Sequence, residues 1–164
     1  MRSVRRLIPD LRRNDDGVAL VEFAIALPMM LLVFAVIVEG SRLMIAYQST
    51  IAGVRDATRY LSRVLPGDIC TSGGHASAYV SRLTTMVGQS VSGRSVLPVS
   101  VTLNSVTPSV ACVSGAYRVN PAPVATVTAS ITVTYPFSGV FLLVGGSVPT
   151  VTTTVTDSAR IFGS

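Results

Sequence analysis

The chain of 164 residues carries a formal net charge of +5, and 49% of its residues are hydrophobic. This length suits a single domain with a membrane anchor and leaves no room for a second domain of enzyme size. The 13 basic residues are all arginines, and five of them lie within the first thirteen positions.

Residues 17–38 follow this basic leader and are apolar except at Glu22 and Pro28: GVALVEFAIALPMMLLVFAVIV. A helix of this length spans roughly 33 Å, which is enough to cross a hydrocarbon layer of about 30 Å. A buried core helix is usually shorter and shows a polar stripe, which residues 23–38 lack. The pattern therefore predicts a membrane anchor.

The leader arginines predict the orientation of this anchor. Short basic flanks stay in the cytoplasm, so the residues after the anchor are expected on the periplasmic or outer side. A nucleic-acid-binding arm is the alternative for a basic leader, but an apolar helix that follows at once disfavours it. A general secretory signal is disfavoured too, because the apolar run exceeds the usual length of about 7 to 15 residues and no small-x-small cleavage site closes it.

Glu22 lies inside the predicted membrane helix. An ionised carboxylate there costs several kcal/mol unless a partner compensates it. Cleavage after Gly17 would supply one, because Val18 would gain an α-amino group that is at least partly positive near neutral pH. Glu22 would then stand at the fifth position of the mature chain.

Two motifs of this region resemble a known family. The stretch from Gly17 to Phe23, GVALVEF, resembles the class III prepilin cleavage site of type IV pilin-like proteins. The run VEFA, with Leu27-Pro28 and the downstream EGSR of residues 39–42, resembles the TadE-like minor pseudopilins of the tight-adherence (Tad, or Flp) pilus. The resemblance covers about residues 17–63.

The resemblance assigns roles to four residues. Gly17 would end the leader, Val18 would be the mature N-terminus, and Glu22 would be the assembly glutamate. Phe23 stands where major Flp pilins often carry tyrosine, and the chain is longer than those pilins. Both departures favour a minor component over the major fibre subunit.

After residue 38, apolar residues recur every three or four positions, which predicts that one helix continues to about residue 66. The positions expected to be buried are Leu43, Tyr47, Ile51, Val54, Ala57, Leu61 and Val64. Arg55, Arg59 and Arg63 share another face, which is either solvated or a docking surface for a neighbouring subunit. Pro66-Gly67 is expected to end the helix.

A second helical pattern covers residues 72–91, with Ser72 placed to cap it. The two cysteines, Cys70 and Cys112, both fall on the exported side. In an oxidising compartment, two thiols some forty residues apart are expected to form a bridge rather than a catalytic pair. A loop of this size would stabilise the domain by roughly 3 to 4 kcal/mol in the chain-entropy account.

From Leu97 the apolar period changes to two, which predicts strands. The clearest is 126–135, where alternate residues are expected to share a buried face: Val127, Ala129, Ile131, Val133 and Tyr135. A threonine-rich strand is expected over 150–159, and a small hairpin over 110–119. The apolar stretch 136–146 is too short to cross a bilayer and is expected to be a core strand or a packed loop, with a membrane-touching or docking loop as the alternative.

Residues with catalytic or metal-binding chemistry are scarce. The only histidine is His75, and the few carboxylates make no recognisable zinc or calcium spacing. The glycine pairs lack the lysine of a phosphate loop and predict turns. We therefore expect neither an enzyme nor a cofactor.

The order helix, helix, antiparallel sheet predicts an α+β fold whose sheet packs on the long N-terminal helix, and this order resembles the pilin architecture. The expected organisation is a basic leader over 1–17, a transmembrane helix over 18–38, its amphipathic continuation over 39–66, and an exported domain over 67–164.

The resemblance implies a minor pseudopilin of the cytoplasmic (inner) membrane that acts in surface adherence. Its expected partners are a prepilin peptidase, other pilin or pseudopilin subunits, and the inner-membrane pilus assembly platform, without nucleic acid. The alternative is an uncleaved single-pass envelope protein with an exported ligand-binding or adhesive domain. This alternative does not explain why Gly17 and Glu22 occur together.

Overall fold

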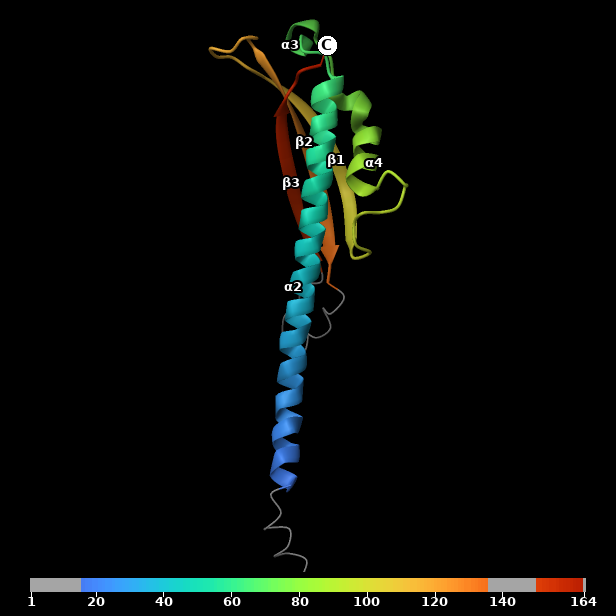
Figure 1. Ribbon diagram of the computed structural model, residues 1–164, viewed down its shortest axis with the longest axis vertical. Coiled ribbons are helices and arrows are strands. Elements are labelled where there is room, and N and C mark those ends of the chain that lie inside the picture. Colours follow the sequence, from blue (N-terminus) through green and yellow to red (C-terminus); the bar gives the residue numbers. More distant parts are fainter. Residues whose placement is uncertain (1–15, 136–149, 164) are drawn as a thin grey trace, which may run out of the picture. The chain divides into compact units, whose positions relative to one another are not determined.

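The computed structural model describes residues 16–135 and 150–163, so the leader before Asp16 and the apolar stretch 136–146 lie outside the described residues. The chain divides into two compact units, Met1–Val38 and Glu39–Ser164. The elements are α2 (Asp16–Val64), α3 (Ile69–Ser72), the 3₁₀ helix η2 (Ala76–Tyr79), α4 (Val80–Gly88), β1 (Val101–Val113), β2 (Ala122–Thr134) and β3 (Thr150–Arg160) (Figure 1). This order confirms the predicted α+β class.

The second unit is a three-stranded antiparallel sheet covered by helices. The strand order is β1-β2-β3, so β2 is the central strand. In Figure 1, α4 lies beside β1 within this unit. The main core joins Val54 and Leu61 of α2, Leu83 of α4, and Val127 and Ala129 of β2, all fully buried.

The part of α2 in this unit buries a stripe that differs from the predicted one. Val54, Ala57 and Leu61 are fully buried as expected, but Ile51 and Val64 are 37% and 39% exposed. Thr50 and Thr58 take buried positions instead. Their hydroxyls donate to the carbonyl oxygens of the residues four positions earlier, each at 2.8 Å, so neither hydroxyl is buried without a partner.

α2 ends at Val64, next to the predicted stop Pro66-Gly67. The end of the chain then packs against this turn. The Gly67 amide donates to the Gly163 carbonyl at 2.8 Å, and the Phe162 amide donates to the Ser62 carbonyl at 2.9 Å. These two backbone hydrogen bonds therefore join segments that are nearly 100 positions apart in the chain.

The single helix predicted over 72–91 is wrong in its bounds. Ser72 ends α3 instead of capping a new helix, because Gly73 after it adopts a left-handed φ of 75°. Helical structure resumes at Ala76 and stops at Gly88, after which Gln89 is extended and bridges to Ser95. Leu83 and Val87 are the fully buried residues of α4.

The predicted alternation in β2 is confirmed. Val127, Ala129, Ile131 and Val133 are buried, whereas Tyr135 lies beyond the end of the strand and is half-buried. The opposite face carries pairs of hydroxyl groups across β2 and β3. Their oxygen distances are 2.8 Å for Thr126–Ser158, 3.0 Å for Thr128–Thr156 and 2.8 Å for Thr132–Thr152.

β1 contains a bulge that changes which residues face the core. Leu103 pairs with Ile131 and Ser105 with Ser130, which leaves Asn104 as the extra residue. The Asn104 amide donates to the Thr132 hydroxyl at 2.8 Å on the outer face. Before the bulge the residues on the core side of β1 are odd-numbered, and after it they are even-numbered: Val106, Pro108, Val110 and Cys112. Cys112 is on this side of the strand but is exposed.

The small hairpin predicted over 110–119 is not formed. Residues 110–113 continue β1, and β2 starts only at Ala122. The connection between these long strands contains a cis peptide bond between Asn120 and Pro121, and the Asn120 side chain accepts a hydrogen bond from the Gly115 amide at 3.2 Å. Ser114-Gly115, at the middle of the predicted hairpin, is thus part of a longer connection between two full-length strands.

Candidate functional site

The residues of the predicted processing site lie in the first two turns of α2, which begins at Asp16. Gly17 is exposed, and a Cβ added to it would meet no atom within 4 Å. The fold of the described residues therefore gives no steric reason for a glycine at position 17. A requirement for glycine there would have to come from a molecule that acts on this segment.

The side chains after Gly17 face outward on all sides of the helix. Val18, Leu20 and Phe23 are 65%, 71% and 61% exposed, and Glu22 is exposed as well. Residues four apart lie on one helix face, so Glu22 follows Val18 by a little more than one turn. This spacing allows the Glu22 carboxylate to reach an amine on Val18 of the same or an adjacent helix.

The helix that carries this site is long and apolar enough to cross a membrane. Its most apolar window has a mean hydropathy of 2.6, and only 6% of that window is buried. A core helix of a water-soluble domain would be mostly buried, so this reading is disfavoured. Pro28 lies inside the helix, and it removes one backbone donor there.

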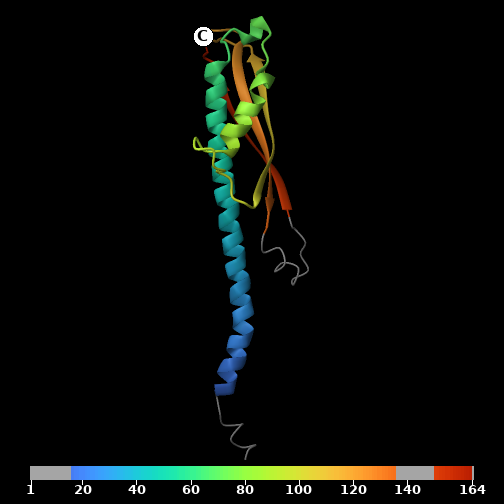
Figure 2. The same cartoon turned by 90° about the vertical axis from the view of Figure 1, so that its right-hand side faces the viewer.

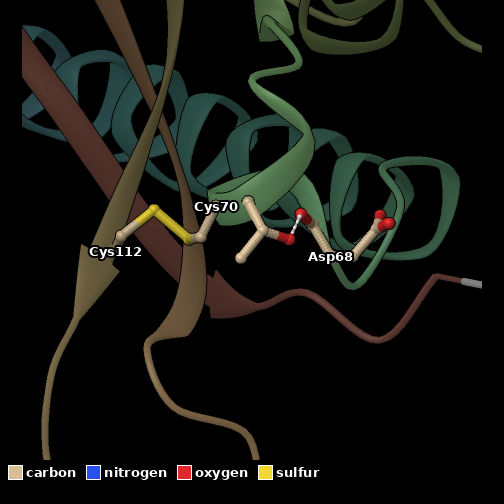
Figure 3. Close-up of a disulfide and its surroundings, with 4 residues drawn as sticks. Asp68, Cys70 and Cys112 are labelled. Carbon is tan, nitrogen blue, oxygen red and sulfur yellow. Dashed lines mark hydrogen bonds between the residues drawn. A yellow bond between two sulfur atoms is a disulfide. The ribbon is translucent and has the colours of Figure 1, made fainter.

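The predicted disulfide between Cys70 and Cys112 is present. It joins α3 to the end of β1, with the two Cα atoms 5.9 Å apart and a sequence separation of 42 (Figure 3). Cys70 packs against the main core, and Cys112 lies on the core-facing side of β1 because of the bulge at Asn104. The bridge therefore fixes the segment after α2 to the sheet.

Arg55, Arg59 and Arg63 of α2 are exposed, as is His75 before η2. The Nη1 atom of Arg59 lies 3.9 Å from Oδ1 of Asp56, and the two side chains are 66% and 67% exposed. Within residues 16–135 and 150–163, no group of three His, Cys, Asp or Glu side chains is placed to hold a metal ion.

The sequence analysis did not predict two features of α2. Glu39 is only 5% exposed although it is ionisable, and no role was predicted for it. Gly53 lies against the backbone of Val87 on α4. A glycine within the apolar period of a helix was the available signal for the second feature, because glycine weakens a helix unless close packing requires it.

Together, the anchor and the α+β unit after it fit a single-pass membrane protein. Residues 17–59 match the family model described as TadE-like protein, so the resemblance read from the motifs is confirmed over this segment. The match starts at Gly17 and connects the chain with Tad pilus systems. The chain matches no curated protein sequence and no solved structure.

Proposed function

We propose that this protein is a minor pseudopilin that is cut by a prepilin peptidase between Gly17 and Val18 and then takes part in assembling a Tad-type pilus for surface adherence. The observation that carries the proposal is the family match that begins at Gly17, at the start of a long apolar helix with an acidic residue in its second turn.

The proposal assigns the catalytic role to one enzyme and the role of substrate to this chain. A membrane-embedded peptidase performs the cleavage, and this chain is its substrate. The leader stays in the cytoplasm, and the second unit is exported to the periplasmic or outer side of the inner membrane. The mature helix then packs with other pilin helices at the assembly platform, without catalysis by this chain.

In the proposed assembly, Glu22 pairs with the new α-amino group of Val18 from its own helix or from a neighbour. The pair neutralises two charges that would each be costly in a low-dielectric helix bundle. Phe23 next to it offers an aromatic side chain, 61% exposed, for packing against an adjacent helix.

N-terminal sequencing of protein purified from membranes tests the processing step. In cells with an active prepilin peptidase the mature chain should begin VALVEF. Gly17→Arg should leave the full-length chain in the membrane, while Gly40→Ala, at another open glycine of α2, should be processed normally. A mature chain that retains Met1 in such cells would contradict the proposal and favour an uncleaved envelope protein.

A further inference from the structure

The part of α2 in the second unit has an uncovered face opposite its buried stripe. At 3.6 residues per turn, this outer face is formed by Met44, Ile45, Ile51, Arg55, Arg59 and Arg63. Figure 2 shows the sheet on the other side of this part of the helix. Ile51 and Arg55 lie at the edge of this face, where they line a hollow with residues 154–157 of β3, including Asp157. Met44, Ile45, Arg59 and Arg63 are exposed.

The N-terminal part of the outer face, formed by Met44, Ile45 and Ile51, is apolar. Met44 and Ile45 are 60% and 55% exposed, and Ile51, predicted to be buried, is 37% exposed. Large apolar side chains gathered on one helix face indicate a surface that binds another protein element. The six residues follow the membrane anchor in the chain, so a partner that packs here would be a neighbour of the anchored helix.

The C-terminal part of the outer face is positively charged. Arg55, Arg59 and Arg63 follow one another at intervals of four residues, so they form a line along the helix. Among the described residues, Asp56 is the only carboxylate within ion-pair distance of this line. Residues 39–164 hold eight arginines and four acidic residues, so the unit supplies few carboxylates for compensation.

A second copy of the chain fits this face poorly when the two helices lie parallel and in register. In that arrangement Arg55, Arg59 and Arg63 of one copy would face the same arginines of the other. Like charges placed opposite one another disfavour a contact. A helix with carboxylates at the same spacing and apolar residues nearer its anchor is complementary to both parts of the face.

We propose that the outer face of α2 binds an acidic amphipathic helix of a different pilin-class subunit, so that this protein joins the pilus machinery through a heterotypic contact. The inference rests on the proposed function, because the partner is taken from the same assembly. It adds the chemistry of the partner helix and predicts that this face does not pair with itself in register.

The test uses the full-length protein co-expressed, one at a time, with each other pilin-class subunit of its own pilus system. Arg55→Glu/Arg59→Glu/Arg63→Glu is compared with Arg82→Glu/Arg94→Glu/Arg118→Glu, which changes the net charge equally at exposed arginines outside α2. The α2 variant should co-purify about tenfold to a hundredfold less with the cognate subunit, and the control variant should not change. Replacement of the partner's acidic residues by arginine should restore its co-purification with the α2 variant.

A photo-crosslinking residue at the exposed position Gln48 identifies what touches the face. Crosslinks to a helix of the cognate subunit support the proposal, whereas crosslinks to α2 of a second copy overturn it. Equal co-purification of both triple variants also overturns it and shows the arginines to be a solvated surface. N-terminal sequencing of every variant separates this outcome from failed processing, and retention of the Cys70–Cys112 bridge shows that the domain has folded.

Discussion

Gly53 of α2 lies directly against the backbone of Val87 on α4. A Cβ on Gly53 would stand 2.9 Å from both the Cα and the carbonyl oxygen of Val87, closer than such contacts allow. Gly53 therefore sets how closely the two helices pack. Both residues are buried, and Val87 belongs to the main core.

Gly53→Ala should destabilise the second unit by about 1 to 3 kcal/mol, because the backbone of α4 must move and the gain in helix propensity is smaller. Thermal or urea unfolding of the protein in detergent micelles measures the change. Gly40→Ala is the matched control in the same helix, where a Cβ meets no atom within 4 Å, and it should be neutral or slightly stabilising. Equal stabilities of the two variants would refute the packing role of Gly53.

Gly163→Ala should detach the end of the chain from the end of α2. A Cβ there would overlap the carbonyl oxygen of Leu65, so the backbone cannot stay in place. The hydrogen bond from the Gly67 amide to the Gly163 carbonyl should be lost, and the cost should be about 1 to 2 kcal/mol because the end can fray.

Hydrogen exchange at the Gly67 amide detects this detachment, and the amide should exchange faster in Gly163→Ala. Gly88→Ala serves as the control, since its Cβ would make an ordinary contact with the Leu103 side chain at 3.5 Å. Unchanged protection of the Gly67 amide in Gly163→Ala would show that the junction does not depend on a glycine.

Replacement of both cysteines, Cys70→Ser/Cys112→Ser, should destabilise the domain by about 3 to 4 kcal/mol in the chain-entropy account, because the loop closed by the bridge spans 42 positions. Denaturant unfolding of the wild type under oxidising and reducing conditions should reproduce the same difference. A double variant as stable as the oxidised wild type would show that the sheet and helices hold this segment without the bridge.

Glu22→Ala should separate processing from assembly. Gly17 and the entry to the membrane remain, so cleavage should survive, whereas the Val18 amine would face no carboxylate in the helix bundle. Removal of one member of such a buried pair costs about 3 to 5 kcal/mol, which corresponds to a loss of about two to four orders of magnitude in association. Glu22→Gln should behave like Glu22→Ala, and Glu22→Asp should retain part of the function.

Co-purification of the processed Glu22 variants with the assembly complex, together with counts of surface pili, checks this prediction. Glu22→Ala that is processed, co-purified and piliated like the wild type would remove any assembly role for the carboxylate. The alternative of an anchored envelope protein would then gain support.

The sequence by itself determined the features that depend on local patterns. The length and hydropathy of residues 17–38 predicted a helix able to cross a membrane, and the alternation from Val127 to Val133 predicted the buried face of β2. The pairing of Cys70 with Cys112 followed from their number and the expected compartment. Such signals need only neighbours in the chain or a count of residues, so one sequence suffices to read them.

The tertiary structure decided the features that depend on residues far apart in the chain. The bulge at Asn104 changes the parity of β1, and it places Cys112 on the core side, opposite Pro123 of β2. The apolar pattern of β1 does not predict this change of core-facing side, because the change arises from the register of β1 against β2. Likewise Ile51 is exposed and Thr50 buried, because the rotation of α2 is fixed by the surfaces that pack on it, and the threonine hydroxyl is satisfied within its own helix. Burial follows the partner surface, which a local pattern does not contain.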